Sequence, residues 1–77
     1  MPGQEKAIFR ECYNLLVENL GKPKMQKEDW ENLKLQFTRL TKEKFTEIDD
    51  MMLCVELMGV ICNHIARKQV QIGNTTV

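Results

Sequence analysis

The sequence predicts an all-α protein: a three-helix bundle with a long, central third helix that pairs with a second copy of the chain. Three observations support this prediction. The segment from Thr46 to Gln71 carries more apolar surface than any other part of the chain and contains no Pro. Two shorter segments before it repeat apolar residues with the period of an α-helix. Between those two segments stand a Gly and a Pro, which mark a turn.

Length and composition limit the classes of protein to be considered. Seventy-seven residues with 43% hydrophobic and 29% charged side chains are typical of one globular domain, spanning 1–77. A chain this short buries only about 60–65% of its unfolded surface, so a partner is a common source of added stability. The formal net charge is zero, which gives no overall attraction to nucleic acid or membranes. We find neither a bilayer-spanning apolar run nor the apolar core of a signal peptide.

The first helix is expected over residues 4–20. Apolar residues occupy one face of it and charged residues the other, a pattern that packing in a core explains fully. The apolar face comprises Ile8, Phe9, Cys12, Tyr13, Leu15, Leu16 and Leu20. Gly21 suits the position after a helix end and Pro23 prevents the helix from continuing. The first helix therefore ends before a short polar connection.

The second helix is expected over residues 27–41. A narrow apolar seam runs along it, formed by Trp30, Leu33, Phe37 and Leu40. Acidic residues near its start and basic residues near its end match the helix dipole. Leu35 lies off the seam and is expected to face solvent at least in part. Residues 42–45 contain neither Gly nor Pro, so the sequence leaves open whether the second helix ends or bends there.

The third helix is expected over residues 47–71, followed by a frayed tail at 72–77. At 1.5 Å per residue it overhangs the other two helices. The face expected to pack in the core comprises Met51, Cys54, Val55, Met58, Gly59, Ile61, Cys62, Ile65 and Ala66. A second line of residues points toward the polar side of the helix. This line, the outer stripe, consists of Leu53, Leu57, Val60 and His64.

The outer stripe gives the main functional indication. Exposed apolar patches tend to mark contact sites, and a monomeric bundle has no use for a second apolar line. We expect the outer stripe to bind a partner, most simply a second copy of the chain, or else another helical protein. Burial under one of the chain's own termini is the competing explanation. The predicted function is a non-enzymatic, self-associating protein–protein interaction module of a regulatory or accessory kind.

RNA binding is the alternative function. Between Lys22 and Lys44 the chain has seven basic residues and four acidic ones. The lysine stripe on the second helix consists of Lys27, Lys34 and Lys42, with Arg39 as an added contact. Its two-turn spacing suits the phosphate backbone of duplex RNA, bound without reading the sequence by a small helical dimer, as in a small viral accessory protein. Against this, Glu31 interrupts the stripe and no exposed aromatic side chain is expected for stacking.

The sequence predicts no enzymatic activity, metal ion or cofactor. Cys54 and Cys62 are more than two helical turns apart, and Cys62 and His64 point to nearly opposite sides, so no ligand set converges. Cys12 brings the number of cysteines to three, and unpaired core thiols favour a reducing compartment, the cytosol or the nucleus. The C-terminal residues Thr75–Val77 have the general form of peptides that PDZ domains capture, a short pattern that is common by chance.

Overall fold

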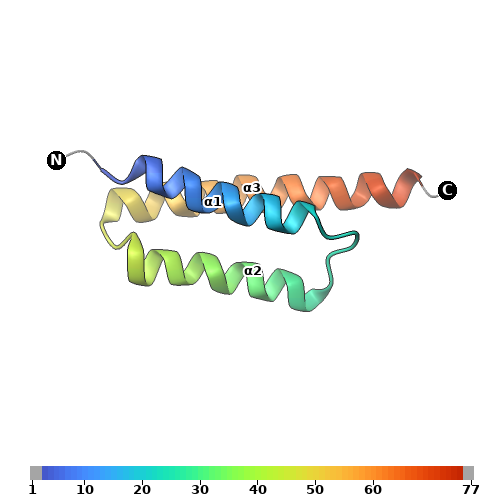
Figure 1. The fold of residues 1–77 in the computed structure, drawn as a ribbon, viewed down its shortest axis with the longest axis horizontal. Coiled ribbons are helices and arrows are strands. Elements are labelled where there is room, and N and C mark those ends of the chain that lie inside the picture. Colours follow the sequence, from blue (N-terminus) through green and yellow to red (C-terminus); the bar gives the residue numbers. More distant parts are fainter. Residues whose placement is uncertain (1–2, 76–77) are drawn as a thin grey trace.

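The computed structural model describes residues 3–75 of the chain, and the side chains of residues 3–70. Over this range the protein is all-α, as predicted, and contains no strand. The elements are α1 (Glu5–Leu20), α2 (Lys27–Arg39), the π-helical turn η1 (Leu40–Lys44) and α3 (Ile48–Thr75). They form a three-helix bundle in which α1 and α3 run in the same direction and α2 runs against them (Figure 1).

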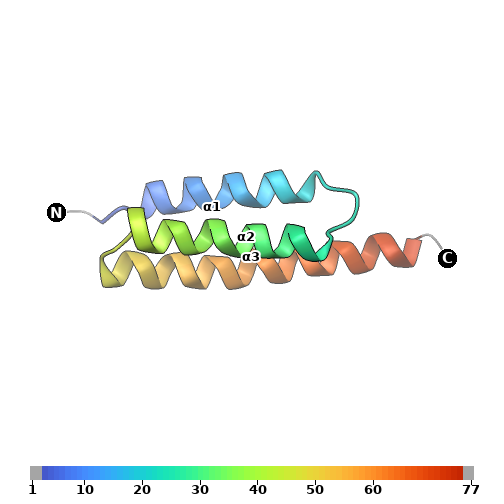
Figure 2. The ribbon, with the colours of Figure 1, turned by 90° about the horizontal axis from the view of Figure 1, so that it is seen from below.

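The arrangement of the bundle leaves one side of α3 without a neighbour. α3 has 28 residues, against 16 in α1 and 13 in α2, and its C-terminal part extends past the connection between them (Figure 1). α1 packs mainly against α3, and α2 packs against α3 and η1. Seen from below, α2 lies between the other two helices, so the three axes form a triangle (Figure 2). A side chain on α3 that points away from both α1 and α2 therefore contacts nothing else in the bundle.

The connection between α1 and α2 is held by local hydrogen bonds. α1 ends at Leu20, as predicted, and the Gly21 N–H donates to the Val17 carbonyl at 3.2 Å. At the start of α2 the Asp29 carboxylate accepts a hydrogen bond from the Gln26 N–H at 2.8 Å. The same carboxylate pairs with Lys22 Nζ at 3.2 Å. The Gln26 N–H and, second, the lysine lower the pKa of the Asp29 carboxyl, so this turn is held by a charged cap.

The π-helical turn answers the question that the sequence leaves open at residues 42–45. The second helix neither stops at Thr41 nor bends there; it widens into η1 and ends at Lys44. The Phe45 N–H donates to the Leu40 carbonyl at 2.7 Å, the five-residue span of a π-helix. The chain then turns at Phe45, whose side chain is fully buried. Lys44 Nζ, 3.0 Å from Glu11 Oε1, ties the same corner to α1.

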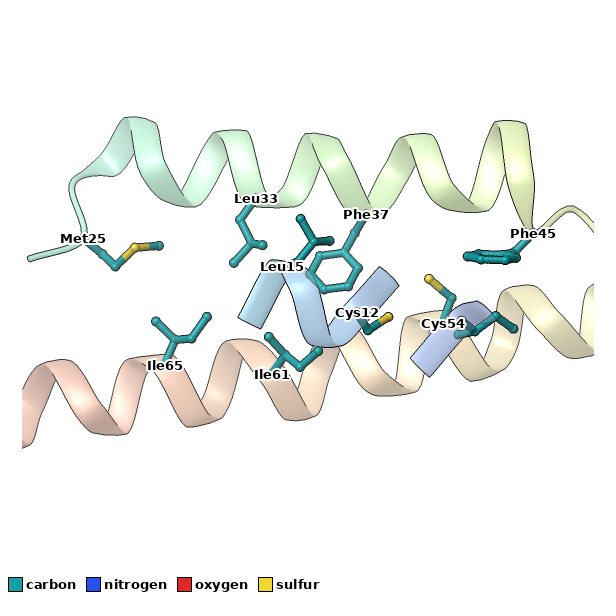
Figure 3. Packing of buried hydrophobic residues seen from close by; sticks show 10 residues of the cluster. Cys12, Leu15, Met25, Leu33, Phe37, Phe45, Cys54, Ile61 and Ile65 are labelled. Carbon is teal, nitrogen blue, oxygen red and sulfur yellow. The ribbon is translucent and has the colours of Figure 1, made fainter. Parts of the chain in front are cut away.

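The hydrophobic core runs along the bundle between the three helices. Its buried members are Ile8, Cys12, Leu15, Met25, Leu33, Phe37, Phe45, Cys54, Ile61 and Ile65. Met25 lies at one end of this cluster and Phe45 at the other (Figure 3). The predicted seam of α2 is confirmed, because Leu33 and Phe37 are buried and Trp30 packs half-buried against the cluster. Leu35 is exposed, also as predicted.

The apolar face predicted for α1 is broader than the face that the bundle buries. Phe9, Tyr13 and Leu20 are exposed rather than part of the core. Asn19 is buried instead, and its Nδ2 donates to the Leu15 carbonyl at 2.7 Å. Because α1 packs mainly against a single helix, α3, it buries a narrow strip of its surface.

The face predicted for α3 is rotated relative to the one that packs in the core. Cys54, Ile61 and Ile65 are buried as predicted, but other members of the predicted face are exposed. The exposed members are Met51, Val55, Gly59 and Ala66. A polar residue, Asp50, takes a buried position and accepts a hydrogen bond from the Gln4 N–H at 3.4 Å. Apolar residues cover so much of α3 that hydrophobicity alone did not fix its orientation.

The C-terminal end of α3 also differs from the expectation. The helix continues through Thr75, where a frayed tail at residues 72–77 was predicted. The PDZ-ligand-like pattern Thr75–Val77 ends outside the described residues. Among the helices of the described range, none has the length and hydropathy needed to cross a membrane.

Candidate interaction surfaces

The outer stripe predicted from the sequence is only partly exposed. Leu53 and Leu57 are half-buried and pack against the core cluster, and His64 is also half-buried. Only Val60 faces outward, with 63% of its surface exposed. Leu57 is four residues from buried Ile61, and this spacing places both on the same side of a helix. The prediction that Leu53 and Leu57 point away from the core is therefore wrong.

A different apolar line follows the free side of α3. This line, the α3 seam, consists of Ile48, Met52, Val55, Gly59, Cys62 and Ala66. Its members are separated alternately by four and three residues, the heptad spacing of helices that pair with other helices. Ile48 is 73% exposed, Met52 57% and Val55 51%. Gly59 and Ala66 are exposed, whereas Cys62 is half-buried and packs in part against the core cluster, so the seam is least open at Cys62.

The ends of the α3 seam are set by the bundle itself. One heptad step before Ile48 stands Phe45, which is buried at the corner after η1. One step after Ala66 stands Gln69, whose Oε1 accepts a hydrogen bond from the Met25 N–H at 2.8 Å. Both neighbouring positions are thus engaged within the protomer. The free seam spans residues 48–66, roughly 27 Å at 1.5 Å per residue.

Gly59 lies in the middle of the α3 seam, and no contact within the protomer explains why this position is a glycine. A Cβ atom at this position would have no neighbour within 4 Å. Glycine in an exposed helix interior costs roughly 0.5–1 kcal/mol relative to Ala. Within the bundle no close contact requires the missing side chain. A second backbone that approaches α3 closely at Gly59 would require it.

The polar flank of the seam has charges of opposite sign at its two ends. Asp49 and Glu56 are exposed beside the N-terminal half of the seam. Asn63 and Arg67 are exposed beside the C-terminal half, on the same flank. The flank therefore changes from acidic to basic along the helix.

A second exposed apolar surface lies on α1. This α1 stripe consists of Phe9, Tyr13, Val17 and Leu20, all exposed. It lies on the side of α1 opposite Glu11 and Glu18, which face α2 across a shallow hollow. The expectation that no aromatic side chain is exposed is therefore wrong.

The hollow between α1 and α2 has a volume of about 340 Å³. Its lining residues are Glu11, Asn14, Leu15, Glu18, Gln36, Arg39 and Leu40. The lining mixes carboxylates, amides and one guanidinium and contains no cysteine, serine or histidine that a base might activate.

The basic residues of the lysine stripe lie on α2 and η1. Lys27, Lys34 and Lys42 are exposed, as the lysine stripe requires. Arg39 is exposed and also lines the hollow beside the carboxylates of α1. The exposed aromatic residues lie on the side of α1 that faces away from α2. The exposed Phe9 and Tyr13 of α1 therefore lie apart from the lysine stripe.

The three cysteines are free thiols, two of them in the core. Burial is the main reason that the pKa of Cys12 is raised to about 12, and the neighbouring Cys54 raises it further. Burial also raises the pKa values of Cys54 and Cys62. The buried Cys12 and Cys54 thiols therefore stay protonated near neutral pH and are poor nucleophiles. Within the described residues no group of three His, Cys, Asp or Glu side chains converges on a metal position.

Comparison with known proteins adds no relative. No protein-family model, no curated protein and no solved structure matches the chain significantly. A function is therefore argued from these surfaces alone.

Proposed function

We propose that the protein is a non-enzymatic helical interaction module that associates with a second copy of itself through the α3 seam. The observation that carries this proposal is the continuous heptad line from Ile48 to Ala66 on the free side of α3. A surface helix that served only its own bundle would place polar residues there. The contact first expected at the outer stripe moves to this seam, because Leu53 and Leu57 are needed in the core.

The size of the seam argues for a weak, concentration-dependent association. Fully burying a side chain such as Ile48, Met52 or Val55 stabilises a complex by about 1.5–3 kcal/mol. Association also costs several kcal/mol of translational and rotational freedom. A seam of six residues is small beside a standard protein interface. We therefore expect dissociation in the micromolar range and exchange between monomer and dimer.

The three free thiols support a reducing compartment, the cytosol or the nucleus, for this module.

Light scattering of the full chain from micromolar to millimolar concentration tests the proposal. Wild type is expected to change from monomer to dimer over this range. Val55→Glu places a carboxylate in the middle of the seam, where pairing would desolvate it, and should leave the protein monomeric. Val70→Glu is the matched control, because it makes the same change at an exposed valine of the same helix beyond the end of the seam.

The remaining outcomes separate the competing explanations. A wild-type protein that stays monomeric at millimolar concentration overturns self-association. A dimer that survives Val55→Glu but dissociates with Tyr13→Glu places the contact on the α1 stripe and overturns the role of the seam. The lysine stripe is tested with generic duplex RNA at low salt. Salt-sensitive binding that Lys34→Glu weakens for all sequences would support RNA binding instead.

A further inference from the structure

We infer that the two copies pair antiparallel through the α3 seam, in one defined register. This inference rests on the proposed self-association and adds its geometry. Three contacts, each made twice by symmetry, define the register. They are Ile48 with Ala66 of the second copy, Met52 with Cys62 of the second copy, and Val55 with Gly59 of the second copy. A two-fold axis then passes near position 57.

The sizes of the side chains favour this orientation over a parallel one. The N-terminal half of the seam is large, with Ile48, Met52 and Val55. The C-terminal half is small and consists of Gly59, Cys62 and Ala66. Antiparallel pairing sets one large residue against one small residue in every layer, so the two helices stay at a uniform distance. Parallel pairing would set large residues against each other at one end of the seam and small residues against each other at the other end. The small end would then contain cavities, which lower the packing density.

The two ends of the seam select this register among the antiparallel ones. Phe45 is buried in its own core and Gln69 is bonded to Met25, so neither position is free to extend the seam. Only the register that pairs the first seam residue, Ile48, with the last, Ala66, uses all six positions. It also places Val55 of one copy over Gly59 of the other. The empty space above Gly59 is then filled by a side chain, which gives the glycine a reason to be there.

The charges beside the seam favour the same orientation. In the antiparallel pair, Asp49 lies within one helical turn of Arg67 of the second copy. A parallel pair would place this flank of the two copies on opposite sides of the seam, so Asp49 would not have Arg67 of the second copy as a neighbour. Opposed helix dipoles add to the preference for the antiparallel arrangement. The charges on this flank of one copy are therefore complementary to the charges on the same flank of an antiparallel second copy.

Disulfide trapping tests the geometry, with diamide as the oxidant that takes up the two hydrogen atoms of each thiol pair. In the inferred dimer the two Cys62 residues lie about ten residues apart along the seam, roughly 15 Å. A disulfide requires Cα atoms about 4.4–6.8 Å apart. Oxidised wild type should therefore give no covalent dimer. Met52→Cys places a new thiol opposite Cys62 of the second copy and should give a covalent dimer that reductant dissolves.

Two further variants complete the test. The double variant with Met52→Cys and Cys62→Ser has one seam thiol, at position 52. This thiol lies far from position 52 of the second copy, so the double variant should form no covalent dimer. Met52→Cys with Val55→Glu should also lose it, because the noncovalent contact is gone. Covalent dimers from wild type, or from the variant with Cys62→Ser, would show a parallel pair or another antiparallel register and overturn the inference while leaving self-association intact. A wild-type dimer in light scattering that Met52→Cys fails to trap also overturns the register. A strictly monomeric wild type overturns the proposed function itself.

Discussion

Phe37 shows how much of the stability rests on single core residues. It is among the largest fully buried side chains, whereas Leu35 on the same helix is exposed. Phe37→Ala is expected to lower the free energy of unfolding by about 3–5 kcal/mol, because it removes contacts and leaves a cavity. Leu35→Ala, the matched control, should cost less than about 1 kcal/mol. Urea unfolding followed by Trp30 fluorescence measures both. Equal losses for the two variants would contradict the orientation of α2.

The core thiols predict a loss of stability in alkaline solution. The pKa of Cys12 rises from 9.0 in the unfolded chain to about 12 in the folded protein. The folded state therefore holds the protonated thiol, and its contribution is complete below about pH 9. That contribution is lost as the pH rises from 9 toward 12, because the unfolded thiol ionises first.

The measurement is the urea midpoint at neutral pH and at pH 10.5, for wild type and Cys12→Ala. Other groups also titrate in this range, so the difference between the two proteins carries the result. Wild type should lose more of its midpoint than Cys12→Ala. An equal loss of the urea midpoint in both proteins would show that the Cys12 thiol does not stay protonated in the folded protein.

At the level of the helix, α3 determines where a partner binds. Glu56 is the one charge that the antiparallel pair places near its own copy, because it lies beside the two-fold axis. Glu56→Gln is expected to strengthen self-association by up to about fivefold, the effect of one exposed charge pair. Asp49→Asn should weaken self-association, because it removes the attraction to Arg67 of the second copy.

Sedimentation equilibrium at low salt measures both dissociation constants. Added salt should reduce both effects, since it screens exposed charges. If both variants changed the dissociation constant in the same direction, the predicted alignment of the two flanks would be wrong.

At the level of the whole molecule, association should add to the stability of a small bundle. A partner that binds only the folded state raises the melting temperature as its concentration rises. We therefore expect the midpoint of thermal unfolding of wild type, followed by circular dichroism, to increase from micromolar to millimolar protein. Val70→Glu should retain this dependence and Val55→Glu should lose it. A midpoint that is independent of concentration for wild type would count against a folded dimer.

The sequence by itself determined the features that depend on local spacing. Gly21 and Pro23 marked the end of α1, and Leu33 and Phe37 marked the buried side of α2 because their seam is narrow. The overhang of α3 also followed from the sequence, whereas its continuation through Thr75 did not. These properties follow from turn chemistry and from helices with one apolar side, so neighbouring residues are enough to predict them.

Only the tertiary structure decided which side of α3 faces inward. Apolar residues occupy both the Leu53–Leu57 side and the Val55–Gly59 side, so the helical period gave no unique orientation. The positions of α1 and α2 made the choice: the first side packs against the core and the second faces solvent. Asp50 shows the same effect. It lies at the start of α3 and is buried because this part of α3 packs near the N-terminus of α1. Orientation about a helix axis is set by contacts between segments far apart in the chain, and local sequence does not contain them.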